Sequence, residues 1–213
     1  MRTDNLKVLS MKAQKKGVEA NGMRINDELH FSPKFRFADL DWEDKGSLIV
    51  AFHDRVYGYY LCPASILVEN RNAFAAGVLL VTTIDFLANI QIGGNTGSRI
   101  EQWLVNHITA FRDQDPGNPR RTLAKRFYDE FRNGLVHEGR IKNGGQFTYE
   151  IDGLVVISDS SVMIVHPGYL LESIVKAFEM YLKNLAEDEF TFQHFRCALI
   201  NIFQKDVALA KNS

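Results

Sequence analysis

Residues 70–91 read NRNAFAAGVLLVTTIDFLANIQ, the most apolar stretch of the chain. Placed on a helix, its apolar residues, Val78 and Ile84 among them, point in nearly every direction around the axis. A helix that is apolar on all sides is buried, so we predict that this one is the central helix of a bundle. Two threonines and Asp85 interrupt the apolar run, which favours a core helix over a membrane span.

Amphipathic patterns on both sides of this stretch predict further helices. Apolar residues recur there at three-to-four spacing, the period of an α-helix that packs on one face. The expected helices cover about 47–62, 98–111, 120–138, 168–186 and 191–209, the first of them ending at Cys62-Pro63. We therefore predict a mainly α fold, an up-down helical bundle of five or six helices, with residues 41–213 as a single helical bundle domain.

Two other segments are not helical in pattern. Over about 146–165, apolar residues follow a period of two, which predicts a small antiparallel β-hairpin inserted into the bundle, with Asp152-Gly153 as its turn. Residues 1–40 are polar or interrupted by Pro33. They predict an N-terminal arm that contains one or two short strands.

The composition is that of an ordinary globular domain. The chain has 213 residues, of which 46% are hydrophobic and 24% charged, and its net charge is −1. Cys62 and Cys197 are far apart in apolar surroundings, so we expect buried free thiols in a cytoplasmic protein without a signal peptide. No histidine has partners at metal-ligand spacing, so we predict neither a metal nor a cofactor. We also expect no membrane partner.

Charge is distributed unevenly along this nearly neutral chain. Basic residues gather between positions 118 and 142, on and around the expected helix 120–138, for which Asn118-Pro119 is a favourable start. Such a patch favours a polyanionic partner. The residues expected to hold its backbone are Arg120, Arg121, Lys125, Arg126 and Arg140.

The end of the same helix carries the most site-like residues. Residues 132–137 read RNGLVH. Asn133 and His137 are four positions apart and share one stripe of the helix. Arg132 lies about 140° around the axis from His137, so one straight helix cannot aim both at a common point. Two copies of the helix that meet can form a composite site, which favours a homodimer.

The pattern Arg-Asn-x-x-x-His on a late helix of a bundle resembles the R-x(4–6)-H motif of HEPN domains, in many of which Asn follows the Arg directly. The resemblance covers about residues 45–186, and the 1–40 arm and the 146–165 hairpin are additions to a minimal HEPN domain. It implies a bundle that dimerises. Many members are metal-independent endoribonucleases, often in toxin–antitoxin or defence systems, and others are inactive and bind partners.

By this resemblance, Arg132 and His137 are the catalytic pair and Asn133 is a polar helper. The chemistry suits these residue types. Cleavage of RNA without a metal uses the 2′-hydroxyl as the nucleophile, and a group with a pKa near neutrality, such as a histidine, can move its proton. A guanidinium suits the phosphate that gains charge.

Three interpretations stay open at this point. The chain is a HEPN-like endoribonuclease, or a non-catalytic HEPN-like module that binds an antitoxin, another protein or a nucleotide. In the third interpretation it is an unrelated bundle, where His137 only faces the helix dipole and Arg132 pairs with Asp129. Asp85 can support the site by pairing with Arg132. It can also face outward or cap a local hydroxyl, which we favour because carboxylates are seldom buried.

Overall fold

The structure is a computed structural model that describes residues 24–25 and 28–210, and residues 1–23 of the expected arm lie outside them. Most of the described chain is helical, as the sequence predicts, and two of its turns are π-helical. The helical elements are α2 (Lys45–Val56), π-helical η2 (Tyr57–Leu61), α3 (Cys62–Glu69), α4 (Ala73–Gln91), α5 (Thr96–His107), α6 (Leu123–Phe127), π-helical η4 (Tyr128–Arg132), α7 (Asn133–Glu138), α8 (Pro167–Glu187) and α9 (Glu189–Ala210), with 3-10 turns η1 (Phe37–Asp39), η3 (Thr109–Phe111) and η5 (Lys142–Gly144).

Small β-sheets accompany the helices. The strands are β1 (Arg24–Ile25), β2 (Glu28–Leu29), β3 (Gln114–Asp115), β4 (Asn118–Thr122), β5 (Gln146–Phe147), β6 (Val155–Ile157) and β7 (Met163–Val165). β1 pairs with β2 and β3 with β4, both antiparallel, and the third sheet has the order β5-β7-β6. The predicted hairpin is present as the antiparallel pair β6–β7, to which β5 adds a parallel strand.

The position predicted for the hairpin turn is wrong. The chain reverses between Ser158 and Val162, where the Ser158 N–H donates to the Val162 carbonyl at 3.0 Å. Asp152-Gly153 lies instead in the bend before β6, with Gly153 at φ 130°. The register explains the difference, because Val155 pairs with Val165 and Ile157 with Met163, which leaves residues 158–162 as the connection.

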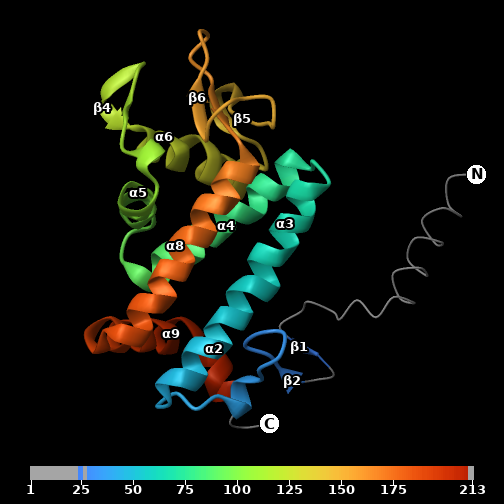
Figure 1. Cartoon of the computed structure of the whole chain (residues 1–213), viewed down its shortest axis with the longest axis vertical. Coiled ribbons are helices and arrows are strands. Elements are labelled where there is room, and N and C mark those ends of the chain that lie inside the picture. The colour runs from blue at the N-terminus through green and yellow to red at the C-terminus, as the bar shows by residue number, and fades with distance from the viewer. Residues whose placement is uncertain (1–23, 26–27, 211–213) are drawn as a thin grey trace, which may run out of the picture.

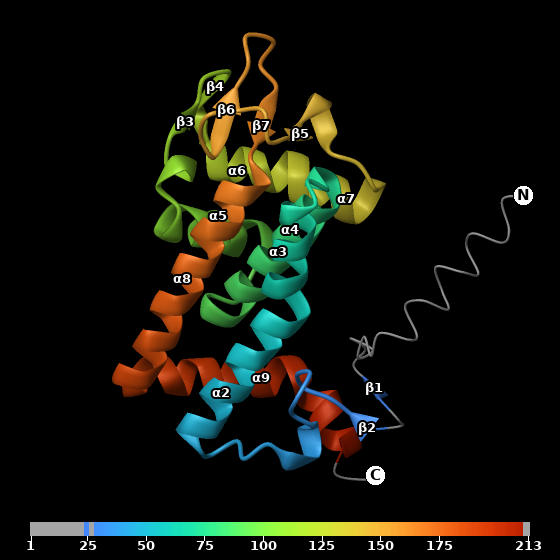
Figure 2. The same ribbon diagram turned by 45° about the vertical axis from the view of Figure 1, so that its right-hand side comes forward.

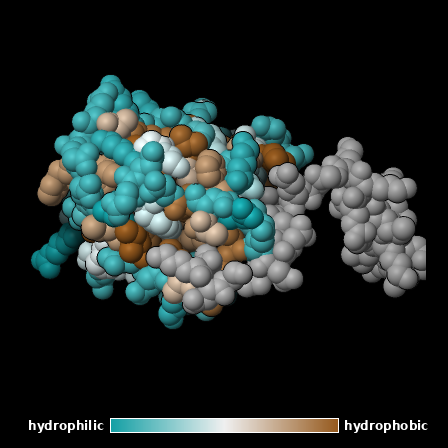
Figure 3. Space-filling model, turned by 90° about the horizontal axis from the view of Figure 1, so that it is seen from below, coloured by the Kyte–Doolittle hydropathy of each residue, from teal (hydrophilic) through white to brown (hydrophobic). Residues whose placement is uncertain are grey.

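The helices form a bundle with different structures at its two ends (Figures 1 and 2). α2–α3 and α8 run along its length and pack on each other. α6 and α7 lie at one end together with β3–β7, whereas α9 crosses the opposite end, near β1 and β2. Seen from below, at the α9 end, apolar residues lie in separate patches between hydrophilic ones (Figure 3).

α4 is the central helix, as residues 70–91 predict. It packs against α3, α5, α8 and α9, and Leu80, Ile84 and Leu87 are buried. In the part of the chain that the structure describes, α4 is also the one helix long and apolar enough to cross a membrane, by length and composition alone. Half of that apolar window is buried inside the fold, as expected for a core helix.

The first helix does not end at Cys62-Pro63, where the sequence predicts its end. A π turn, η2, precedes this point, and the Cys62 N–H bonds to the carbonyl of Tyr57, five residues back. A proline in a regular α-helix has no N–H and its ring collides with the carbonyl four residues earlier. The wider turn relieves this conflict, so α3 continues to Glu69.

The N-terminal segment joins the hydrophobic core before residue 41. Phe31 and Phe37 are buried, and their ring centroids lie 5.5 and 5.6 Å from that of Phe203 in α9. Arg55 of α2, also buried, donates to the Phe31 carbonyl and lies over the Phe203 ring. Cation–π contact therefore takes the place of a carboxylate partner for this guanidinium.

Both cysteines are exposed, which corrects the expectation of buried thiols. Cys197 lies in α9 between the buried residues Phe195 and Leu199. Since these two are four positions apart and face the core, a residue midway between them points to the opposite side of the helix. Local apolar sequence around a cysteine therefore did not indicate its burial.

A glycine in α4 allows β5 to dock on the central helix. A Cβ built on Gly77 would lie 2.2 Å from ring atoms of Phe147, whose ring also packs on Phe131 at 5.0 Å between centroids. Any side chain at position 77 would therefore push β5, and the sheet that it begins, away from the bundle.

We expect Gly77→Ala to lower the free energy of unfolding by about 1–3 kcal/mol, because overpacking outweighs the better helix propensity of alanine. Gly46→Ala in α2 is the matched control. Its Cβ would meet only the Asp44 carboxylate at 3.4 Å, so it should stabilise the protein by up to about 1 kcal/mol. Urea unfolding measures both. A stabilising effect of Gly77→Ala would contradict the packing described here.

Candidate functional site

The motif helix begins at Leu123 and not near Arg120. Residues 118–122 form β4, which pairs with β3, and this pairing excludes the helix start predicted at Asn118-Pro119. Thr122 is the N-cap instead, since its hydroxyl accepts from the Lys125 N–H at 3.0 Å. The predicted end is correct, because Gly139 follows Glu138 in the left-handed conformation at φ 65°.

The π turn η4 leads into the motif and includes its first residue, Arg132. In η4 the Asn133 N–H bonds to the Tyr128 carbonyl, five residues back. Such a turn holds one more residue than an α-helical turn. The side chains of α6 therefore point about 100° away from the directions that they would have if α6 and α7 formed one regular α-helix. Short π segments are frequent at functional sites. Residues 133–138 are regular, so the separation of Arg132 and His137 around the axis remains as predicted.

Arg132 is held by Asp85 of the central helix. Its Nε and Nη2 donate to Asp85 Oδ2 at 3.1 and 2.8 Å. The side chains of Arg132 and Asp85 are 16% and 20% exposed, so the pair lies at the edge of the core. The outward-facing or capping role predicted for Asp85 is therefore wrong. The ion pair predicted between Arg132 and Asp129 is also wrong, since Asp129 pairs with Lys125.

Arg99 is a member of this cluster that sequence reasoning missed. Its Nη2 donates to Asp85 Oδ1 at 2.8 Å, and its Nη1 donates to the Gly94 carbonyl at 3.2 Å. Arg99 lies in the first turn of α5 and reaches Asp85 because α4 and α5 pack against each other. No motif marks it, so only this packing could have indicated it.

The structure brings Asn133 to Arg132 but leaves His137 apart. Arg132 Nη1 donates to Asn133 Oδ1 at 3.3 Å. The His137 side chain is exposed and makes no hydrogen bond or ion pair with another described residue. Arg132 points toward Asp85 of α4, while His137, five residues later, is exposed to solvent. A single copy therefore assembles Asp85, Arg99, Arg132 and Asn133 without the histidine.

Arg126 is buried and not available to a substrate, which corrects the prediction that it holds an RNA backbone. Its side chain is 5% exposed. Nη1 donates to Asp115 at 3.0 Å and Nε to Glu130 at 3.0 Å, and Nη2 reaches the Ser161 carbonyl. The basic pattern favoured a surface position for Arg126, but the β3–β4 hairpin, through Asp115, and the β6–β7 turn, through Ser161, cover it.

Arg121 belongs to the same buried network. Its Nε donates to Asp115 Oδ2 at 2.9 Å. Burial by itself raises the pKa of the Asp115 carboxyl, but hydrogen bonds from Arg121 and from the Gly117 N–H, with the nearby charge of Arg126, outweigh burial and hold the pKa below its usual range. Arg121 is thus paired with Asp115. To bind a substrate, as the sequence predicts, it would have to break this ion pair.

The other predicted backbone contacts lie at the surface. Lys125 pairs with Asp129 at 2.8 Å, and Arg140 pairs with Glu138 at 2.7 Å while its side chain stays 67% exposed. Arg120 is exposed. These three side chains can reach a polyanion, because exposed ion pairs of this kind are weak.

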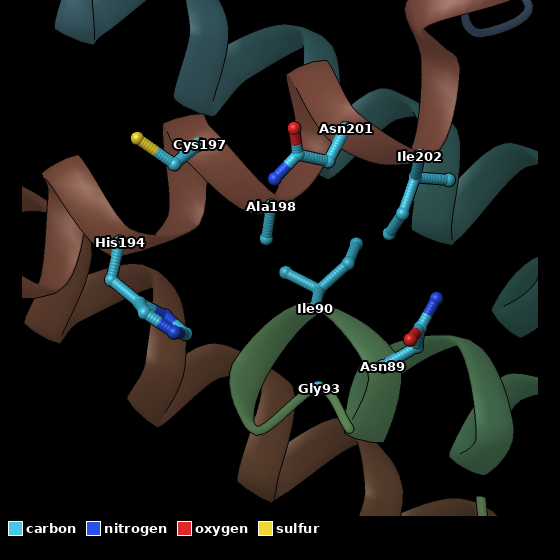
Figure 4. Close-up of a pocket in the computed structure, with 8 residues that line it drawn as sticks. All are labelled: Asn89, Ile90, Gly93, His194, Cys197, Ala198, Asn201 and Ile202. Carbon is cyan, nitrogen blue, oxygen red and sulfur yellow. The ribbon is translucent and has the colours of Figure 1, made fainter. Parts of the chain in front are cut away.

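A cavity of about 330 Å³ lies between the end of α4 and α9 (Figure 4). Asn89, His194 and Asn201 provide its polar lining, and the Cys197 side chain points away from the α4 residues in this view. The volume suits a small molecule. None of the Asp85 cluster residues lines it.

Metal ligands are not grouped in the described ranges. No three or more His, Cys, Asp or Glu side chains among residues 28–210 are placed to hold a metal ion. The charge at the candidate site instead comes from guanidinium groups that share one carboxylate.

Comparison with known proteins gives no relative: no family model, curated protein or solved structure matches the chain.

The buried network predicts that replacing Arg126 lowers the free energy of unfolding much more than replacing its neighbour Lys125. Arg126→Met leaves Asp115 and Glu130 short of a buried partner, so we expect the free energy of unfolding to fall by about 3–5 kcal/mol. Lys125→Met removes a partly exposed pair and should cost at most about 1 kcal/mol. Chemical denaturation followed by circular dichroism compares the two. Similar losses in both variants would show that Arg126 is not a buried ion-pair centre.

Proposed function

We propose that this chain is a HEPN-like, metal-independent endoribonuclease that acts as a homodimer. One observation carries the proposal. The Arg132 guanidinium is fixed through two N–H groups on Asp85, while His137, five residues later in α7, is exposed and its side chain has no partner among the described residues. An oriented arginine and a free histidine are the groups that this chemistry needs.

Arg132 is suited to a phosphodiester that gains charge. The guanidinium has five N–H groups in a fixed fork, and its bonds to Asp85 and Asn133 leave N–H groups free on Nη1 and Nη2. Because Asp85 fixes the plane of the fork, little ordering is needed when a phosphate binds. Asp85 is thus a positioning residue for Arg132.

His137 completes the site from a second copy. It accepts the proton of the RNA 2′-hydroxyl as the 2′-oxygen attacks phosphorus, and the 5′-oxygen leaves with a proton from solvent, so that a 2′,3′-cyclic phosphate forms. Since Arg132 and His137 of one copy point about 140° apart, the histidine next to a given Arg132 comes from the other copy.

Apolar side chains beside the motif support this arrangement. Val136 is 58% exposed and Phe74 is 53% exposed. Phe74 lines a depression of about 300 Å³ together with Gly139 and Arg140 at the end of α7. Burial of these side chains against a second copy would stabilise a dimer next to His137.

Cleavage of single-stranded RNA in EDTA tests the proposal. We expect cleavage by the wild type, a loss of about 10²- to 10³-fold in Arg132→Ala and a loss of about 10²- to 10⁴-fold in His137→Ala. Arg132→Lys should also fail, because lysine cannot replace a bidentate fork. His194→Ala, an exposed histidine on α9, is the control and should keep full activity.

Equal residual cleavage in Arg132→Ala, His137→Ala and the wild type would assign the activity to a contaminant and overturn the proposal. No cleavage together with tight RNA or protein binding would favour the non-catalytic module. The nearly enclosed Arg132–Asp85 pair is the observation that favours that second function, since an arginine committed to a carboxylate has fewer groups for chemistry.

The dimer has its own test. We expect wild-type protein to sediment as a dimer and Val136→Glu to sediment as a monomer without cleavage activity, because the new carboxylate is costly to bury. Met180→Glu is the matched control, since Met180 is similarly exposed, at 56%, but lies on α8. A monomeric wild type that still cleaves RNA would contradict the composite site.

A further inference from the structure

One carboxylate serves two arginines in the candidate site. Asp85 Oδ2 accepts from Arg132 Nε and Nη2, and Asp85 Oδ1 accepts from Arg99 Nη2. Neither arginine makes an ion pair with a second carboxylate among residues 28–210. The cluster therefore keeps a net charge of about +1, which a single carboxylate cannot cancel.

The two guanidinium groups approach Asp85 from different helices. Arg132 comes from η4 and Arg99 from α5, and their side chains are 16% and 15% exposed. The two bonds of Arg99, to Asp85 and to the Gly94 carbonyl, leave N–H groups free on both Nη1 and Nη2. Because the arginines bind opposite oxygens of one carboxylate, Asp85 sets a fixed spacing between two positive groups.

We propose that Arg99 is a second phosphate-binding residue of this site, and that the substrate is a single-stranded RNA that places adjacent phosphates on Arg132 and Arg99. This inference rests on the proposed function. A guanidinium fork matches a phosphate as it matches a carboxylate, so each arginine can hold one phosphate while Asp85 keeps both in place. Arg99 binds the phosphate next to the scissile one and takes no part in the proton transfer.

Binding to a strand that cannot be cleaved tests Arg99 without turnover. A fluorescent single-stranded 2′-deoxy oligonucleotide is titrated at several salt concentrations with wild type, Arg99→Gln and Arg112→Gln. We expect Arg99→Gln to weaken binding about 10- to 100-fold. The slope of log affinity against log salt should fall in magnitude by about 0.7, the value for one phosphate contact on a single strand.

Arg112→Gln is the matched control, because Arg112 follows α5 and also donates to backbone carbonyls, those of Val105 and Asn106. It should leave the slope unchanged. Arg99→Lys keeps the charge and should fall between wild type and Arg99→Gln, which provides a second variant if the glutamine variant is unstable. Unchanged affinity and slope in Arg99→Gln would overturn the inference, whether or not the wild type cleaves RNA.

Substrate length separates a phosphate contact from an indirect effect through Asp85. A dinucleoside monophosphate has only the scissile phosphate, so wild type and Arg99→Gln should cleave it at similar rates. A trinucleotide with two phosphates should be cleaved at least about 10-fold faster by the wild type than by Arg99→Gln. Equal losses on both substrates would mean that Arg99 acts only through Asp85 and Arg132, which would contradict the proposal. Absence of cleavage by the wild type would instead defeat the proposed function.

Discussion

The candidate site depends on how a carboxylate in the most apolar helix is neutralised. Asp85 lies in α4 among buried apolar residues, where an unpaired charge would be costly. Arg132 of η4 and Arg99 of α5 both pair with Asp85. The packing of η4 and α5 against α4 therefore depends on this one side chain. The same contacts that compensate this partly buried charge also hold two partly exposed guanidinium groups at the edge of the core.

A second charged network fixes the end of the bundle that carries the site. Arg126 joins Asp115 of β3 to Glu130 of η4 and to the turn after β6. Arg126 and Arg132 are six residues apart on one helical segment, yet one is buried in a structural network and the other contacts Asp85 at the edge of the core. Side chains six residues apart point about 120° apart even on a regular α-helix, so the two arginines meet different neighbours.

Sequence patterns were sufficient for the parts of the fold that depend on apolar periodicity. They located α4 and the end of the motif helix at Glu138, since these follow from burial and local backbone chemistry. They could not show that strands and turns cover Arg126 or that Arg99 reaches Asp85, because both depend on contacts between distant segments. Gly134 is a further example, because a Cβ there would lie 2.3 Å from the Arg140 carbonyl, a contact that no local pattern indicates.

A crystal structure of the protein with a 2′-O-methyl RNA oligonucleotide tests the central claim most directly. The account predicts a phosphate on Arg132 with the Asp85 contact retained, and His137 of a second copy within about 3 Å of the modified 2′-oxygen. RNA bound at another surface, or copies that hold His137 far from every phosphate on Arg132, would contradict it.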